Sequence, residues 1–187
     1  VARPLRSSAN GVLPGGGECT SDNKGTVDKV VGEAVMAVWG EVQSEGPARD
    51  VARAVTAAAQ MQAALAKLNI AWASRGIRTL RMGLGINFGP VIVGNLGATG
   101  AIEKMELTVI GDPVNLASRL EGLTKEYGLD LLLGETAADL VADPFHLQFV
   151  DLVRVKGKKQ PIRVYAVLGP RTSPLPENVS RYAASHA

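Results

Sequence analysis

Short apolar runs separated by glycine and proline turns fill the middle of the chain, and this pattern predicts β-strands. Residues 82–88 and 91–93 form two such runs on either side of Gly89-Pro90, a turn dipeptide. A third run, 107–110, ends at Gly111-Asp112-Pro113. Asp112 is placed there to cap a helix, and Pro113 to occupy its first turn, where a missing N–H costs nothing.

Two longer segments have the 3.6-residue period of amphipathic helices. An Ala-rich segment, 48–74, repeats its larger apolar residues at steps of three and four, and Gly76 follows as the stop. The helix that begins near Pro113 carries an apolar stripe that should face the core. The members of that stripe are Leu116, Leu120, Leu123 and Tyr127.

Further strands are expected before and after these segments. Two β-prone runs, 26–31 and 34–39, are joined by Gly32-Glu33, a two-residue hairpin connection. Beyond Tyr127 the pattern predicts, in order, a strand at 129–133, a short helix at 135–141 and a hairpin with strands at 147–155 and 162–168. Because hairpins are frequent and long crossovers few, these elements predict an α+β fold with a largely antiparallel sheet and helices on one face.

The two ends of the chain lack such periodicity. Residues 1–23 are rich in Gly, Pro, Ser and Asn and are expected to be irregular or disordered. Residues 169–187 are Pro- and Ser-rich and are expected to be a tail or linker. Residues 24–168 then form the one folded domain, which fits a length of 187 residues.

Composition narrows the classes of function. The chain is 46% hydrophobic, enough for a core, while a net charge of +2 without a dense Lys/Arg run gives no argument for nucleic-acid binding. No run of 18 apolar residues exists, so direct membrane insertion is not expected. The single cysteine, Cys19, rules out an internal disulfide framework and fits a reducing, cytoplasmic compartment.

One pair of polar residues is placed for chemistry. Asn115 and Arg119 stand at i and i+4 of the helix after Pro113, so an amide and a guanidinium lie side by side on one face. Together they can hold a developing anion, on phosphate or on a ribose oxygen. A solvated helix face is the alternative for the same two residues, and periodicity alone does not decide between the two interpretations.

Four motifs resemble the catalytic domain of the class III nucleotide cyclases, the adenylate and guanylate cyclases. They are GTVDKVVGEAVMAVWG (25–40), RMGLGINFGPVIVGNLG (81–97), TVIGDPVNLASRLE (108–121) and VKGKKQPIRVY (155–165), in the order that the family has. The resemblance covers most of the chain from Lys24 to Leu168. It implies a ferredoxin-like α+β core, of the class III cyclase type, that works as a dimer.

The resemblance also implies roles for particular residues. Asn115 and Arg119 match the pair that orients the ribose and stabilises charge on the transferring α-phosphate. Lys156 matches the lysine that neutralises the departing pyrophosphate; on sequence alone it is equally a residue of a basic hairpin loop.

Lys29 and Thr108 match the two positions that read the purine. An ammonium group donates to the acceptor nitrogen of adenine, and a hydroxyl accepts from its exocyclic amine. Because guanylate cyclases have a carboxylate at the lysine position, this pair indicates ATP. Without the surrounding motifs, both residues would be interpreted as ordinary strand residues.

Catalysis in this family usually involves two divalent metal ions, Mg²⁺ or Mn²⁺, held on carboxylates. Glu33 stands where the family has an aspartate, with its carboxylate one methylene further out. The other metal aspartate belongs to a motif like F-x-D-I-x-G-F-T on an N-terminal strand, and nothing in 1–23 resembles it. The first strand and first helix of the domain are therefore expected to be missing or replaced.

Two functions follow from these residues. In the first, the chain is an adenylate cyclase domain that converts ATP to cyclic AMP in a homodimer or heterodimer, with Glu33 from one subunit and the other site residues from its partner. In the second, it is a catalytically inactive cyclase homology domain that dimerises with or regulates an active partner. The retained Asn115, Arg119 and Lys156 favour the first, and the missing aspartate favours the second.

Overall fold

The computed structural model describes residues 2–7, 16–31, 34–95, 107–154 and 160–174. The helices and strands of these ranges are, in chain order, β1 (Ala2–Ser7), α1 (Gly16–Asp22), β2 (Thr26–Val31), β3 (Ala34–Val38), α2 (Pro47–Ala73), β4 (Met82–Ile86), β5 (Ile92–Asn95), β6 (Leu107–Ile110), α3 (Asp112–Tyr127), β7 (Leu131–Gly134), α4 (Glu135–Val141), β8 (Phe145–Val153) and β9 (Ile162–Pro170).

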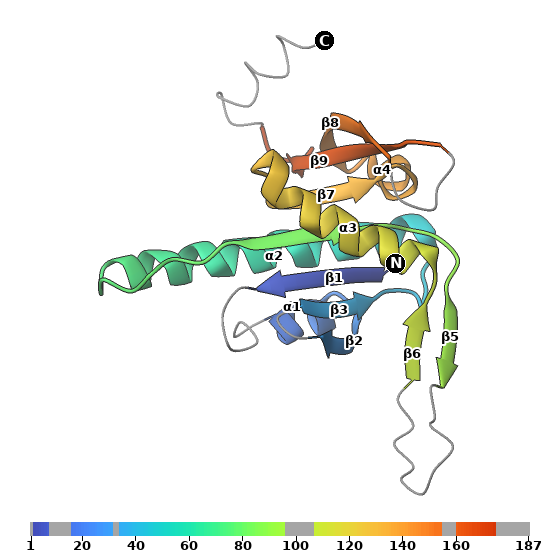
Figure 1. The fold of residues 1–187 in the computed structure, drawn as a ribbon, viewed down its shortest axis with the longest axis horizontal. Coiled ribbons are helices and arrows are strands. Elements are labelled where there is room, and N and C mark those ends of the chain that lie inside the picture. Colours follow the sequence, from blue (N-terminus) through green and yellow to red (C-terminus); the bar gives the residue numbers. More distant parts are fainter. Residues whose placement is uncertain (1, 8–15, 32–33, 96–106, 155–159, 175–187) are drawn as a thin grey trace, which may run out of the picture.

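Seven strands form one mixed sheet in the order β2-β3-β1-β4-β7-β9-β8. The remaining two, β5 and β6, pair with each other in an arm that extends away from the sheet (Figure 1). Neighbouring strands are antiparallel except β4 and β7, which are parallel. The chain crosses between those two strands through the arm and α3, so they can run in the same direction. The α+β class and the largely antiparallel sheet are confirmed.

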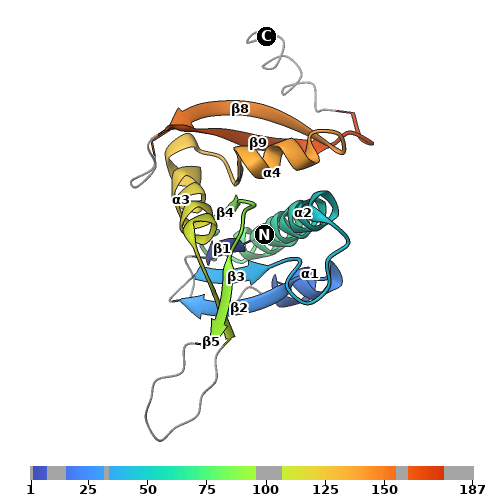
Figure 2. The ribbon, with the colours of Figure 1, turned by 90° about the vertical axis from the view of Figure 1, so that its right-hand side faces the viewer.

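Helices cover both faces of the sheet (Figure 2). The helices α1, α2 and α4 lie on one face, where Leu84 and Leu133 belong to the main core cluster. Helix α3 lies on the other, where Leu120 shares a second cluster with Leu132 of β7. Successive strand residues point to opposite faces, so a sheet centre that is apolar on both sides needs two helical layers. The expectation of helices on one face therefore holds for three helices and fails for α3.

Helix α3 lies directly on the backbone of β4, because that strand has no side chains on the facing side. Gly83 and Gly85 alternate there with buried apolar residues of the opposite face. A Cβ at Gly85 would overlap the carbonyl oxygen of Ala117 and lie 2.5 Å from the backbone nitrogen of Glu121. The two glycines thus set how closely α3, which carries Asn115 and Arg119, approaches the sheet.

Strand β1, an interior strand beside β4, lies in the segment that the sequence predicts to be irregular. It pairs antiparallel with β3 from Ala2 to Arg6 and with β4 from Leu5 to Ser7. Its sequence, ARPLRS, shows no apolar alternation, and Pro4 has no N–H to donate. Its pairing with β3 and β4 accounts for a strand in this segment. The expectation of an irregular N-terminus is wrong for residues 2–7, where the structure has a strand whose sequence lacks the family motif.

Helix α1 corrects the same expectation for the end of that segment. It has seven residues, with Thr20 buried and Cys19 packed against the main core. Just after it, the Trp39 indole donates to the carbonyl oxygen of Asn23 over 2.9 Å. A Cβ at Gly25 would lie 2.5 Å from that ring. The short helix is therefore fixed by tertiary contacts that no local period reveals.

Helix α3 begins at the predicted place, but with a different cap. Gly111, at φ 153°, is the N-cap, and no side chain caps the helix. Asp112 is the first helical residue, so the prediction that it caps the helix is wrong by one position; Pro113 in the first turn is confirmed. The Asp112 carboxylate still lies where the helix dipole favours negative charge.

The other predicted elements are confirmed with small shifts at their ends. The strand at 107–110 and the helix at 135–141 have the predicted bounds. Strand β9 continues to Pro170, into the predicted tail, and the tail from residue 175 lies outside the described residues. The hairpin tip Gly32-Glu33 also lies outside them.

The longest described helix is α2, with 27 residues. Neither it nor any other helix within the described ranges is both long and apolar enough to cross a membrane.

A hydrogen bond joins the end of α3 to the edge strand β8 and makes stability depend on pH. The Tyr127 hydroxyl donates to Oδ2 of Asp151 over 2.7 Å, and this bond raises the pKa of Tyr127 to about 12. The same bond, with that from the Leu152 N–H, lowers the pKa of Asp151. The contribution of Tyr127 to the stability of the fold is therefore fully present below the ordinary tyrosine pKa of 10.0. It is lost as pH rises through about 12. The contribution of Asp151 to the stability of the fold is present above the ordinary aspartate pKa of 3.8, and it is lost as pH falls below that value.

We expect Tyr127→Phe to be less stable than the wild type by a constant amount between about pH 5 and 9. Urea denaturation across the pH range measures this difference, which should shrink above pH 10 and below pH 4. A difference that stays the same up to pH 12 would contradict the hydrogen bond.

Candidate functional site

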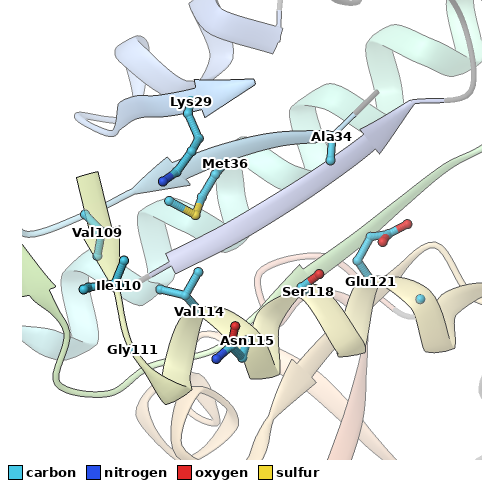
Figure 3. Close-up of a pocket in the computed structure, with 11 residues that line it drawn as sticks. Lys29, Ala34, Met36, Val109, Ile110, Gly111, Val114, Asn115, Ser118 and Glu121 are labelled. Atoms are coloured by element: carbon cyan, nitrogen blue, oxygen red, sulfur yellow. The ribbon is translucent and has the colours of Figure 1, made fainter. Parts of the chain in front are cut away.

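A cavity of about 640 Å³ lies between α3 and the strands β2, β3 and β6 (Figure 3). It is open to solvent on one side of the molecule. Its walls are formed by Lys29, Ala34, Met36, Val109, Ile110, Gly111, Val114, Asn115, Ser118, Glu121 and Gly122.

One wall of the cavity is a single face of α3. Val114, Asn115, Ser118, Glu121 and Gly122 recur there at helical spacing, so their side chains follow one another along the cavity. Asn115 and Ser118 are exposed, and Glu121 is buried. Sequence reasoning missed Ser118 and Glu121, although their spacing of three and six residues from Asn115 was the signal that could have found them.

The opposite wall comes from the β2–β3 hairpin. Lys29 and Met36 project from neighbouring strands toward the space above α3 (Figure 3). Lys29 Nζ lies 3.5 Å from Oδ2 of Asp28. Met36 and Val109 are buried in a small apolar cluster against which Val114 packs. The cavity therefore has an apolar floor with a cation, an amide, a hydroxyl and a carboxylate around it.

The first turn of α3 is held from below by the end of β4. Asn87, which is buried, donates through Nδ2 to the carbonyl oxygen of Pro113 over 3.3 Å. Thr136, in α4, donates to the carbonyl oxygen of Phe88 over 2.7 Å. These bonds join β4 to the N-terminal ends of α3 and α4, and so fix the turn from which Asn115 projects.

The structure brings together some of the predicted site residues. Lys29 and Asn115, 86 positions apart in the numbering of the chain, line the same cavity. Arg119 lies one helical turn beyond Asn115, is exposed, and is not part of the lining. Thr108 lies on β6, paired with Gly94 and next to the cavity residue Val109. Glu33 and Lys156 lie outside the described residues.

The described residues do not fit the divalent metal ion that the resemblance implies. Within them, no three His, Cys, Asp or Glu residues lie together in a group that could hold a metal ion. Strand β1 is where the family motif would place an aspartate, but its sequence ARPLRS contains no acidic residue. Its Arg6 pairs with Ala34, the residue that follows Glu33.

A cavity with an apolar floor and a few polar groups at its rim is the usual form of a small-molecule site. The volume is in the range of such sites, and a flat heterocycle could lie on Met36 and Val109 with its polar edge toward Lys29. The amide of Asn115 and the hydroxyl of Ser118 would then face whatever substituent the heterocycle carries.

Comparisons with known proteins show the family to which the chain is related. The family model described as the adenylate and guanylate cyclase catalytic domain matches residues 19–169. An adenylate cyclase of Anabaena cylindrica is 37% identical over 158 residues, which cover 81% of this chain but only 30% of that protein.

Solved structures of cyclases have the same fold as this chain. The crystal structure of the adenylyl cyclase CyaB from P. aeruginosa superposes with a TM-score of 0.79 at 27% identity, covering 91% of this chain and 93% of that one. The guanylyl cyclase Cya2 superposes with a TM-score of 0.74 at 26% identity, covering 93% and 95%.

Proposed function

The chain belongs to the adenylate and guanylate cyclase catalytic domains, and on this premise we propose that it converts ATP to 3′,5′-cyclic AMP and pyrophosphate. The proposed active site is shared between two subunits. The proposal rests above all on one observation, that Lys29 of β2 and Asn115 of α3 line the same cavity.

The choice of ATP rests on the chemistry of Lys29 and Thr108. The Lys29 ammonium carries only donors, so it suits the acceptor nitrogen N1 of adenine, which in guanine carries a hydrogen. The Thr108 hydroxyl can accept from the exocyclic amine of adenine. Relatives of both specificities resemble this chain, so the preference for adenine is supported by these two residues alone.

The proposed reaction is intramolecular: the ribose 3′ oxygen attacks the α-phosphate and expels pyrophosphate. Asn115 orients the ribose, Arg119 stabilises the charge that develops on the α-phosphate, and Lys156 neutralises the leaving pyrophosphate. Catalysis of this kind is mostly positioning and charge neutralisation, which an amide and two cations supply.

A second subunit is needed to complete the site. Glu33 is the one carboxylate of this chain proposed to hold Mg²⁺ or Mn²⁺, and it would serve the nucleotide bound by the partner. Exposed apolar side chains on the β5–β6 arm, Ile92, Val93 and Ile110, support association with another subunit. The partner is a second copy or another cyclase domain.

One observation favours the alternative, an inactive cyclase homology domain. Strand β1 lies between β3 and β4 in the sheet without bringing an acidic residue. A homodimer would then have only Glu33 at each metal position, whereas a partner with both aspartates would restore it.

Product formation tests the proposal. The purified chain is incubated with Mn²⁺ and either ATP or GTP, first alone and then mixed with a cyclase chain that carries both aspartates but lacks the purine-reading lysine. We expect cyclic AMP in excess of cyclic GMP, and none above background from the Arg119→Ala variant. Absence of both products, alone and in the mixture, would favour the inactive domain.

A further inference from the structure

Strand β2 contains a β-bulge immediately before Lys29. Val27 pairs with Ala37 and Lys29 with Met36, so the register shifts by one residue at Asp28, which is the inserted residue of the bulge. Bulges bend a strand and re-aim the side chains that follow, and they are common beside functional sites.

The bulge determines on which face of the sheet the Lys29 side chain lies. With unbroken alternation, Asp28 would stand opposite Met36, and Lys29 would stand opposite Val35 on the other face. The extra residue instead places Lys29 opposite Met36, and both line the cavity. Val30, next along the strand, is 54% exposed on the opposite face.

The bulged residue is also a buried acid. The Asp28 side chain is 4% exposed and that of Lys29 is 36% exposed, with 3.5 Å between Oδ2 and Nζ. Carboxylates are almost never this deeply buried unless they are paired. The lysine side chain is flexible and has four carbons, so a fixed charge beside it restricts where the ammonium lies.

We propose that Asp28 is a positioning residue that holds the Lys29 ammonium at one point of the cavity and thereby sets the preference for adenine over guanine. This inference rests on the proposed function. At that point the ammonium meets N1 of adenine, whereas the N1–H of guanine is repelled. Without Asp28, the ammonium is free to shift to the neighbouring O6 of guanine, an acceptor that accommodates it.

The test measures the ratio of the dissociation constants for GTP and ATP by saturation-transfer NMR on the full chain. We expect Asp28→Asn to reduce this ratio by about tenfold, mainly through tighter GTP binding, because a site loses discrimination when its donor is no longer fixed. Asp28→Glu keeps the charge and should keep most of the ratio. Asp28→Ser is a second neutral variant, and circular dichroism establishes that each variant is folded before titration.

A matched control is available in Asp50, a buried aspartate that is not part of the cavity lining. It accepts from Ser44 Oγ over 2.6 Å and from the Glu45 N–H over 3.3 Å at the start of α2. Asp50→Asn should lower the melting temperature and leave the ratio unchanged.

The outcomes separate this inference from the proposed function. An unchanged ratio in both neutral variants overturns the role of Asp28, whether or not the chain makes cyclic AMP. Nucleotide binding without any cyclic product overturns the proposed activity, while the ratio still decides the role of Asp28. A wild-type chain that binds neither nucleotide overturns both.

Discussion

Gly85→Ala is expected to lower the free energy of unfolding by about 3 kcal/mol, the upper part of the usual range for overpacking. The added Cβ would overlap the carbonyl oxygen of Ala117 and approach the backbone nitrogen of Glu121 to 2.5 Å. Both are backbone atoms of α3, so no flexible side chain can move aside and the whole helix must shift. Thermal unfolding should show a loss of roughly 6–12 °C for a chain of this length.

The same substitution at an exposed position of α3, away from its contact with β4, is the control. Gly122 lies inside α3, and a Cβ there would meet no atom within 4 Å. Gly122→Ala should therefore be neutral or stabilise the chain by up to about 1 kcal/mol, because alanine has the higher helix propensity. Equal melting temperatures for the two variants would contradict the close approach of α3 to β4.

Arg119→Ala is expected to reduce kcat for cyclic AMP formation by roughly 100- to 1,000-fold, as the loss of a group that stabilises transition-state charge does. The side chain is exposed, so the melting temperature should change little. KM for ATP should change much less than kcat, because the proposed contact forms as charge develops on the α-phosphate. Steady-state kinetics with the product quantified measures both constants.

Two variants on the same helix separate the role of Arg119 from a general charge effect. Lys125→Ala removes another exposed cation of α3 and should leave kcat unchanged. Arg119→Lys keeps the charge but loses the planar fork of donors, so it should recover only part of the activity. If Lys125→Ala lowers kcat as much as Arg119→Ala, the specific role of Arg119 is wrong.

Elements that depend on neighbouring residues were predicted with small errors. The helix of 135–141 and the strand of 107–110 have their predicted bounds, and α3 differs only in its cap. Periodicity, turn residues and proline act within a few positions, so a sequence shows them directly. The strand β1 and the helix α1 were missed because pairing with β3 and β4, and packing against α2, form them.

The residues of the candidate site likewise fall into those that the sequence could predict and those that only the structure shows. Asn115, Arg119, Lys29 and Thr108 were identified because each stands in a motif that resembles a known family. Asp28 was missed even though it lies inside one of those motifs, because its bulge exists only in the register between β2 and β3. Its burial, like that of Glu121, depends on elements distant in the chain.

The sequence by itself determined the family, the order of the central elements and the candidate residues for the chemistry, because motifs and periods are local. Only the tertiary structure decided that an irregular-looking segment forms an interior strand of the sheet, that α3 rests on Gly83 and Gly85, and that Lys29 faces Asn115 across one cavity. These features depend on hydrogen bonds and contacts between residues far apart in the chain, and no local pattern records them.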